Sequence, residues 1–527
     1  MPERYRVRLR GVAKPSGVAL RVLLGGALLL GEFAQEATAR VGAAYGGIIR
    51  VAVSERPSQA VLEPLGWPFA ADERVVARQI HGHLVRIRDG RVEPDLASDV
   101  KVSGRRIDLV LDARLRFSDG SPLLPDDVRA SLEAVARHPS YAWTLDPVAG
   151  FAEFASGSSP HLAGIAVTSA PGISVTLDRD DPSFIWRLAL PWMAIVRRGG
   201  RDSGPAPVIA TSGPFVLGAD GTTLIPFVRH ARGRPYLDGV EYVITAARDH
   251  VLRVGLGDLD VARADPVQLA AESAAARLGV LTSTAATTVV LALRPGSGAP
   301  IDAGRAVELR GILDRRSLVD VLLGGQGVVA STLLPPSILP LPEPPHDSAN
   351  PGEKTPLPRT AARMPPLSIF FSPDFSVPQS VVDRVAVNLL QAGIPSLGRA
   401  RGGADEQSPP PGLAIEEWVP PTLEPELALL ALKMAGDYRS RGAAAGRPPA
   451  WADWPHATDQ AGAALAILRL DVQLQDEALL VPLYHPVTAY AMAKELIGVA
   501  LDPVEQVPLL ENAWLQREPV RKERRGP

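Results

Sequence analysis

Two histidines and two adjacent aspartates are residues whose type and spacing could do chemistry. His81 and His83 could offer imidazole nitrogens to a metal ion. We predict a helix over residues 75–87, where positions two apart point to different faces, so a solvated histidine beside a buried or capping one is the favoured interpretation. Asp126 and Asp127 could form a carboxylate pair, but they stand at a predicted helix start. Carboxylates there interact favourably with the helix dipole, which favours a structural role.

A catalytic apparatus would have to be assembled from dispersed residues. The chain has nine histidines and no cysteine, and it contains no G-x-S-x-G elbow, H-E-x-x-H pair, Walker A loop or Rossmann glycine fingerprint. The lack of cysteine excludes disulfides, thiol catalysis, cysteine-bound metals and a lipid-modified N-terminal cysteine. We therefore predict that the protein is not an enzyme and carries no cofactor and no metal.

The composition is typical of a soluble globular protein with more than one domain. A chain of 527 residues is longer than a domain with a single hydrophobic core usually is. Of its residues, 46% are hydrophobic and 21% are charged. The net charge of −3 leaves no basic excess to neutralise phosphates, so nucleic acid is not an expected partner. Beyond the N-terminal leader no segment is apolar over the length that a bilayer requires, so no stable membrane insertion is expected.

The N-terminus has the layout of a secretory signal peptide. A basic stretch with arginines at positions 4, 6, 8, 10 and 21 precedes the short apolar run 22–30, and small-residue cleavage sites follow at 37–39 or 42–44. The alternatives are a disordered basic leader and an uncleaved membrane anchor. We expect residues 1–44 to be a signal peptide or disordered leader, and the mature protein to be periplasmic.

The stretch 107–132 contains a strand, a turn and a helix start. Apolar residues alternate with mostly polar neighbours from Ile107 to Phe117, which predicts a half-buried strand. Gly120 permits a turn, and Pro125 is favoured in the first turn of a helix. From Arg116 to Val128 the residues read R-F-x-D-G-x-P-L-x-x-D-D-V. This combination resembles the signature of the family 5 extracellular solute-binding proteins, the peptide and nickel-chelate binders of ABC importers.

Other segments resemble the same family in the expected order. They are the opening strand at 46–53, the helical stretch 75–87, and the motifs at 93–97, 211–215, 233–240, 257–262, 313–315, 324–327 and 481–485. The resemblance implies an α/β protein with a two-lobed, type II periplasmic-binding-protein-like fold and an enlarged first lobe. It places the N-terminal part of lobe I at 45–245, lobe II at 246–479, and a return segment that completes lobe I, with a C-terminal tail, at 480–527.

The resemblance also implies a function. A periplasmic substrate-binding protein would capture a peptide-like or other polar solute between its lobes and deliver it to the permease subunits of an ABC transporter. The protein would act as a monomer, and its affinity would come from stacking, displaced water and backbone hydrogen bonds. Closure would be favoured by contacts that the ligand makes with both lobes.

The expected ligand site includes residues near the end of the chain. Peptide-binding members of the family carry a tryptophan in the passage that matches Trp418, and its ring would stack on the ligand. Those members also have an aspartate three residues after the tryptophan, and it pairs with the ammonium group of the peptide. This chain has Pro421 at that position. A buried ammonium without a counter-charge is disfavoured, which argues against a peptide with a free amine. Glu416 and Glu417 are further candidates, together with Glu424 nearby.

Three more residues are candidates for ligand or hinge contacts, namely Tyr484, His485 and Ser54. For each of them, packing or a satisfied hydrogen bond is an equal alternative. We expect at least two of the tryptophans at 143, 186 and 192 to belong to the core.

Departures from the family pattern keep other functions open. The proline-rich segment 334–366 predicts an extended loop where the family has a helix, and further loops are expected at 398–411 and 440–449. A divergent homologue that acts as a ligand sensor or interaction module is therefore one alternative. An exported hydrolase is the other, and it would need a Ser–His–acid cluster.

Overall fold

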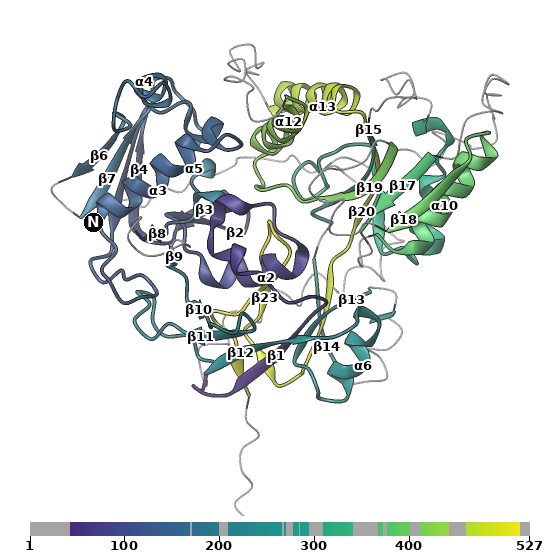
Figure 1. The fold of residues 1–527 in the computed structure, drawn as a ribbon, viewed down its shortest axis with the longest axis horizontal. Helices are drawn as coiled ribbons and strands as arrows, with labels where there is room; N and C mark the ends of the chain where they lie inside the picture. Colours follow the sequence, from purple (N-terminus) through teal and green to yellow (C-terminus); the bar gives the residue numbers. More distant parts are fainter. Residues whose placement is uncertain are drawn as a thin grey trace, which may run out of the picture. The chain divides into compact units, whose positions relative to one another are not determined.

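A computed structural model gives the fold of the chain (Figure 1). The residues that it describes are 43–168, 171–199, 209–265, 268–269, 278–283, 285–294, 309–340, 367–372, 377–400, 412–441 and 460–516. Residues 1–42 of the predicted leader lie outside these residues, as do most of the proline-rich segment and of the two other predicted loops. Mixed sheets and helices confirm the α/β class.

A seven-stranded sheet joins the two ends of the described chain. Its order is β10 (Phe215–Leu217), β11 (Thr223–Pro226), β12 (Gly239–Ile244), β1 (Ile48–Val53), β13 (Val261–Ala264), β21 (Ala489–Met492) and β14 (Gly279–Thr282). β1 runs parallel to β12 and β13, as the expected buried opening strand, and β21 is antiparallel to both of its neighbours. A strand from near the C-terminus therefore lies inside a sheet built mainly by the first half of the chain.

A six-stranded sheet is formed by later residues. Its order is β16 (Gly327–Val329), β20 (Leu480–Pro486), β15 (Thr288–Arg294), β19 (Gly412–Trp418), β17 (Leu367–Phe371) and β18 (Ser396–Ala400). β15 is buried along nearly its whole length and is antiparallel to both β19 and β20. Such a continuous apolar strand is typical of a sheet covered on both faces.

Two backbone crossings connect the seven-stranded and six-stranded sheets. The chain passes from β14 to β15 and returns from β20 to β21. The crossings run side by side, because the Ser283 amide donates to the Thr488 carbonyl at 2.9 Å and the Thr488 amide donates to Ser283 Oγ at 3.2 Å. The predicted lobe boundaries at 245/246 and 479/480 stay predictions, and β12 and β20 are the strands nearest to them.

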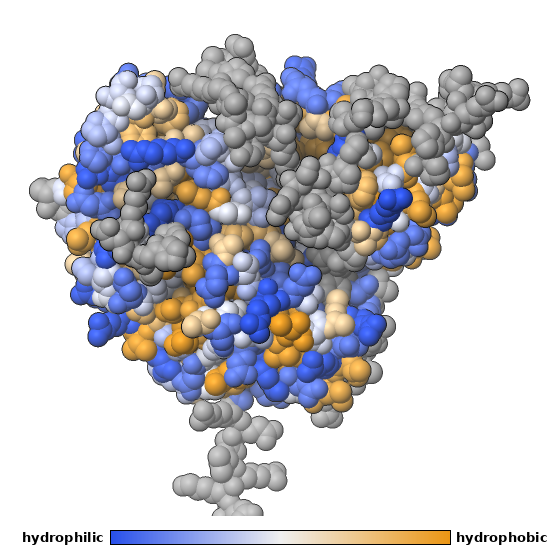
Figure 2. All heavy atoms as spheres, in the orientation of Figure 1, coloured by the Kyte–Doolittle hydropathy of each residue, from blue (hydrophilic) through white to orange (hydrophobic). Residues whose placement is uncertain are grey.

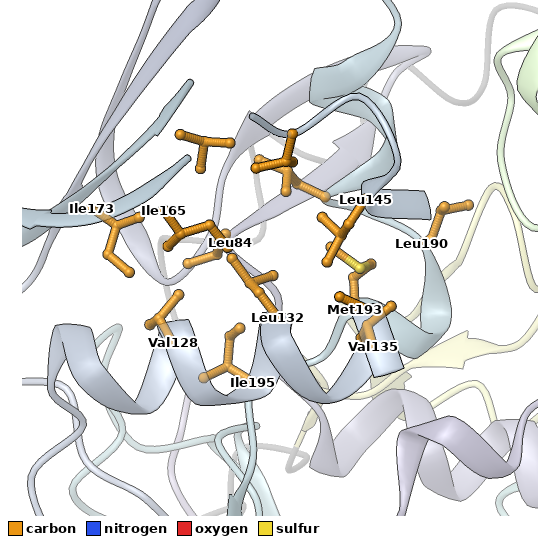
Figure 3. Packing of buried hydrophobic residues seen from close by; sticks show 14 of the residues in the cluster. Leu84, Val128, Leu132, Val135, Leu145, Ile165, Ile173, Leu190, Met193 and Ile195 are labelled. Atoms are coloured by element: carbon orange, nitrogen blue, oxygen red, sulfur yellow. The ribbon is translucent and has the colours of Figure 1, made fainter. Parts of the chain in front are cut away.

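A smaller sheet and helix α3 (Pro125–Arg137) enclose the largest apolar cluster. The sheet order is β4 (Ala97–Ser103), β5 (Arg106–Leu111), β7 (Gly172–Thr176) and β6 (Ile165–Thr168). α3 begins at the predicted proline and buries Val128, Leu132 and Val135 at helical spacing. Figure 3 shows these side chains directed into a cluster with Leu84 and with residues of the strands.

The remaining elements include two-stranded ladders and further α-helices. Two-stranded ladders are formed by β2 (Val85–Arg88) with β3 (Arg91–Pro94), β8 (Arg197–Arg198) with β9 (Ile209–Ala210), β22 (Leu496–Ile497) with β25 (Trp514–Leu515), and β23 (Ala500–Leu501) with β24 (Pro508–Leu509). The other helices are α2 (Ala71–Ile80), α4 (Phe151–Ala155), α5 (Phe184–Arg187), α6 (His250–Gly255), α9 (Arg315–Ser317), α10 (Gln379–Gln391), α12 (Pro425–Arg441) and α13 (Gln460–Glu477).

Two predicted elements end earlier than expected. The helix predicted over residues 75–87 ends at Ile80, whose carbonyl accepts the Gly213 amide at 2.8 Å. A Cβ on Gly213 would come within 2.4 Å of the Ile80 carbonyl carbon, so this close approach needs glycine. The strand predicted to Phe117 ends at Leu111, because the Asp112 carboxylate accepts the Arg114 amide at 2.8 Å and turns the chain.

The start of the proline-rich segment is packed rather than extended. Leu334, Ile338 and Leu339 are buried in a cluster with α12 and α13. The buried Asp471 carboxylate accepts the amides of Leu333 and Leu334 and so anchors this part of the chain to α13. A charged side chain buried in this way needs such donors.

The visible surface mixes hydrophilic and hydrophobic residues (Figure 2). Among the described residues, no helix has the length and apolar character to cross a bilayer.

Replacing Leu132 with alanine tests the largest cluster. Leu132 is 1% exposed, so Leu132→Ala should lower the free energy of unfolding by about 2–5 kcal/mol. Leu124→Ala is the matched control, because Leu124 is 50% exposed and its loss should cost less than about 0.5 kcal/mol. Urea denaturation followed by tryptophan fluorescence measures both. Equal losses in the two variants would contradict the predicted burial.

Candidate functional site

Several residues of the sequence motifs hold backbone segments together. The Asp238 carboxylate accepts the Gly47 amide at 3.0 Å, and the Asp260 carboxylate accepts the Arg50 amide at 2.7 Å. Both aspartates therefore tie β1 to neighbouring segments of the seven-stranded sheet. Ser212 donates its hydroxyl to the Ile195 carbonyl at 2.6 Å. These motif residues position the scaffold.

The Asp126–Asp127 pair also has a structural role. Asp127 accepts the Leu124 amide at 2.8 Å at the start of α3 and pairs with Arg197 at 2.8 Å. Asp126 pairs with Arg129 on the outside of the helix at 2.6 Å. Each carboxylate thus pairs with its own arginine, and both stand at a helix N-terminus, where negative charge is favoured.

His81 and His83 lie after α2, and their rings bond backbone oxygens. His81 Nε2 is 2.7 Å from the Val61 carbonyl oxygen, and His83 Nε2 is 3.2 Å from that of Pro191. Burial lowers the pKa of each histidine to about 4, so both rings are neutral at pH 7. Within the described parts of the chain, no group of three or more His, Asp or Glu side chains is placed to hold a metal ion.

A group of polar side chains lies where the two backbone crossings meet β13 and β19. Glu417, on β19, accepts the Thr287 hydroxyl at 2.7 Å and lies 3.8 Å from the guanidinium of Arg263 on β13. The side chains of Arg263 and Glu417 are only 11% and 12% exposed. This ion pair links the seven-stranded sheet to the six-stranded sheet, and burial strengthens its electrostatic interaction.

Glu416 and Trp418 flank Glu417 on β19. The Glu416 carboxylate accepts a hydrogen bond from Arg294 of β15. Trp418 ends the strand opposite Thr288, is half-buried, and packs against the cluster that contains α12 and α13. Pro421, three residues later, is buried and uncharged. The two acidic side chains of the strand are therefore already engaged by arginines.

His485 is buried in the returning crossing. Its Nδ1 lies 3.0 Å from Thr288 Oγ1 and 3.3 Å from the Thr287 carbonyl oxygen. The Thr288 hydroxyl donates its single hydrogen to the Leu333 carbonyl at 2.6 Å, so Nδ1 of His485 is the donor to both oxygens. Burial lowers the pKa of His485 to about 4. This network secures the crossing next to Glu417.

Tyr484 and Ser54 lie in contrasting surroundings. Tyr484 is fully buried in the apolar cluster of the six-stranded sheet, which favours its packing role. Ser54 is exposed directly after β1, and its amide donates to Asp72 at 2.6 Å. β1 pairs with β13, so Ser54 follows the strand beside the one that carries Arg263. The ligand roles of both residues stay predictions.

No sequence motif indicated a site role for Arg263, Thr287 or Thr288. Arg263 stands between the buried Ala262 and Ala264, so a charge in an otherwise small and apolar strand is the signal that marks it. The adjacent threonines are both buried just before the apolar residues of β15. The expected core tryptophans are confirmed, because Trp143 and Trp192 belong to the largest cluster and Trp186 packs against it.

A separate surface hollow lies on the loop after β11. Its volume is about 620 Å³, and it is lined by Arg114, Arg229, His230, Ala231, Arg232 and Gly233. Arg232 is paired with Asp95 and Glu511, and Arg114 with Asp112, so most of its positive charge is compensated.

Comparison with known proteins identifies the family. Residues 91–361, just over half of the chain, match the model of bacterial extracellular solute-binding proteins, family 5, middle region. The chain belongs to this family. It is a solute-binding protein, and its family is extracellular. No curated protein is significantly similar to it in sequence.

Solved structures similar to this solute-binding protein have the two-lobed periplasmic-binding-protein fold. The murein tripeptide binding protein MppA of Escherichia coli has a TM-score of 0.73 at 17% identity, covering 90% of this chain and 100% of its own. The oligopeptide-binding protein AppA of Bacillus subtilis, in complex with a nonapeptide, has a TM-score of 0.70 at 17% identity with the same coverage. NikA of Staphylococcus aureus, in complex with Ni(L-His)2, has a TM-score of 0.69 at 14% identity, covering 89% and 99%. The predicted fold class is confirmed.

Acid titration tests the burial of His485. A histidine with a folded-state pKa of about 4 and an unfolded value near 6.5 binds more protons when unfolded, so stability falls as the pH drops through this window. The full effect of one such residue is about 3 kcal/mol. His81 and His83 contribute with the same sign, so His485→Gln should flatten the decline without abolishing it. Urea denaturation at pH 7 and pH 4.5 measures the difference, and parallel declines in both proteins would contradict burial of a neutral His485.

Proposed function

We propose that this solute-binding protein captures a peptide-like or other polar solute between the seven-stranded and six-stranded sheets and delivers it to the permease of an ABC importer. The observation that carries the proposal is the Arg263–Glu417 pair, which connects the two sheets beside the crossings. A solute bound there touches both sheets at once and so favours their closed arrangement. Among proteins of similar fold, one is described in complex with a nonapeptide and another is named a murein tripeptide binding protein, which supports a peptide-like solute.

The chemistry of the site suits a polar solute with an apolar face. The half-buried indole of Trp418 offers a surface for stacking, and Arg263 offers donors to a carboxylate or carbonyl oxygen. Ser54 offers an exposed hydroxyl after β1. A few polar groups beside an apolar wall are typical of ligand sites that fix orientation by hydrogen bonds.

The proposal includes binding without catalysis, outside the cytoplasm. The histidines near the site and after α2 are engaged by backbone or threonine oxygens, which leaves them poorly placed as general bases. The cell would therefore use the protein to concentrate a solute for transport. A monomer that changes between open and closed forms is sufficient for this task.

Native mass spectrometry followed by calorimetry tests the ligand site. The purified protein should carry a co-purified solute, and Trp418→Ala should weaken its rebinding at least tenfold, because a stacking surface is lost. Trp186→Ala is the matched control, since Trp186 is also half-buried but packs against the largest cluster. Unchanged affinity in Trp418→Ala, or an equal loss in Trp186→Ala, would contradict the assignment.

A pair of synthetic peptides tests the ligand's charge. Glu416 and Glu417 are both engaged by arginines and Pro421 is uncharged, so a buried ammonium would lack a ready partner on this strand. We expect an N-acetylated tripeptide to bind at least as tightly as the same tripeptide with a free amine. Calorimetry at pH 7 measures both, and a clear preference for the free amine would show that another carboxylate receives the ammonium group.

A further inference from the structure

Helix α12 carries two apolar faces. Leucines, an alanine and a methionine recur at spacings of three and four residues on the first face, which consists of Leu427, Leu430, Ala431 and Met434. The second face includes Ala428 and Leu429, both fully buried. A helix that is apolar on two sides must be covered from two sides, so α12 joins two separate clusters.

The first face packs on the early part of the chain. Its four residues belong to the same cluster as α3, the four-stranded sheet and the aromatic residues around Trp192. In that aromatic group the ring of Tyr141 stacks on Trp192 at 4.5 Å between centroids, and Trp143 meets Trp192 edge-on at 6.0 Å. α12 therefore lies against apolar surface more than 210 residues away in sequence.

The second face packs on the later part of the chain. Ala428 and Leu429 share a cluster with Ile467 and Leu474 of α13 and with Val290 of β15 in the six-stranded sheet. α13 leads directly into β20 of the same sheet. The helix thus bridges the four-stranded sheet and the six-stranded sheet at a place distinct from the two backbone crossings.

Acidic residues lie at the start of α12, where the helix bridges the four-stranded and six-stranded sheets. The Glu424 carboxylate accepts the Leu427 amide at 2.6 Å, and burial raises its pKa to about 7. Glu426 and Asp181, which precedes α5, contribute to this rise by repulsion. Asp181 is itself paired with Arg187 at 3.1 Å. Asp181 therefore lies close enough to Glu424 for their charges to interact, which places the helix start near α5.

We propose that the first face of α12 is an apolar latch, which docks on the largest apolar cluster and holds the solute-binding protein closed without ligand. A closed resting form follows, because the docked face keeps leucine and methionine side chains out of water whether or not a solute is present. Solute binding would then increase the fraction of closed molecules, which is already large without solute. The proposal concerns the ligand-free protein and does not depend on where, or whether, a peptide-like solute binds.

Fluorescence energy transfer between two engineered cysteines tests the latch. The chain has no cysteine, so Lys101→Cys on β4 and Gln391→Cys on α10 give two unique, exposed labelling positions. After unfolding, dialysis and refolding to remove any co-purified solute, the otherwise unmodified protein should show a predominant high-transfer population in single-molecule measurements. Leu430→Ala should lower the ratio of high-transfer to low-transfer molecules at least tenfold, because it removes buried contacts from the docked face.

Leu429→Ala is the matched control. Leu429 is the neighbouring leucine on the same helix, is 0% exposed, and belongs to the second face. The Leu429→Ala variant should be less stable against urea, but its ratio of high-transfer to low-transfer molecules should be unchanged. The latch would be refuted by a ligand-free protein that is already predominantly low-transfer, or by equal ratios in the Leu430→Ala and Leu429→Ala variants. Met434→Ala on the first face provides a second variant should Leu430→Ala fail to fold.

Discussion

The paired backbone crossings are the constraint on which the arrangement of this protein depends. Two large sheets share one chain that passes between them after β14 and again after β20, and Ser283 and Thr488 hold these passages together. Buried polar groups at the crossings must find partners within a few ångströms. Thr288, His485 and the Leu333 carbonyl satisfy one another, and Glu417 receives Thr287 and faces Arg263. The crossings therefore fix both the strand register and the polar groups available to a solute.

The sequence signature of the family and the proposed ligand site are separate parts of the molecule. Asp127, Asp238 and Asp260 bond backbone amides or arginines, and Gly213 allows two segments to approach closely. Such contacts stabilise the fold and do not depend on which solute is bound. This explains how proteins 14–17% identical to this chain, whose descriptions name different ligands, have the same fold.

Local pattern predicted individual elements and the family resemblance implied the two-lobed architecture, while neither predicted the junction between the sheets. Pro125 with two aspartates predicted α3 correctly, because the signals of a helix start are local. The helix predicted to residue 87 ends at Ile80 because Gly213, over 130 residues later, approaches its last carbonyl. The site depends likewise on Arg263 meeting Glu417 from a different sheet, a pairing for which the sequence offers no periodic signal. Burial also favours a packing role for Tyr484, whose position in the apolar cluster no motif could reveal.

The central claim is that a solute binds between the sheets at the Arg263–Glu417 pair. A crystal structure of the protein, purified without removing co-purified small molecules, tests it most directly. The account predicts solute density in contact with the Trp418 indole and the Arg263 guanidinium. Density found elsewhere, such as in the hollow lined by Arg229 and Arg232, with nothing bound beside Trp418, would contradict it.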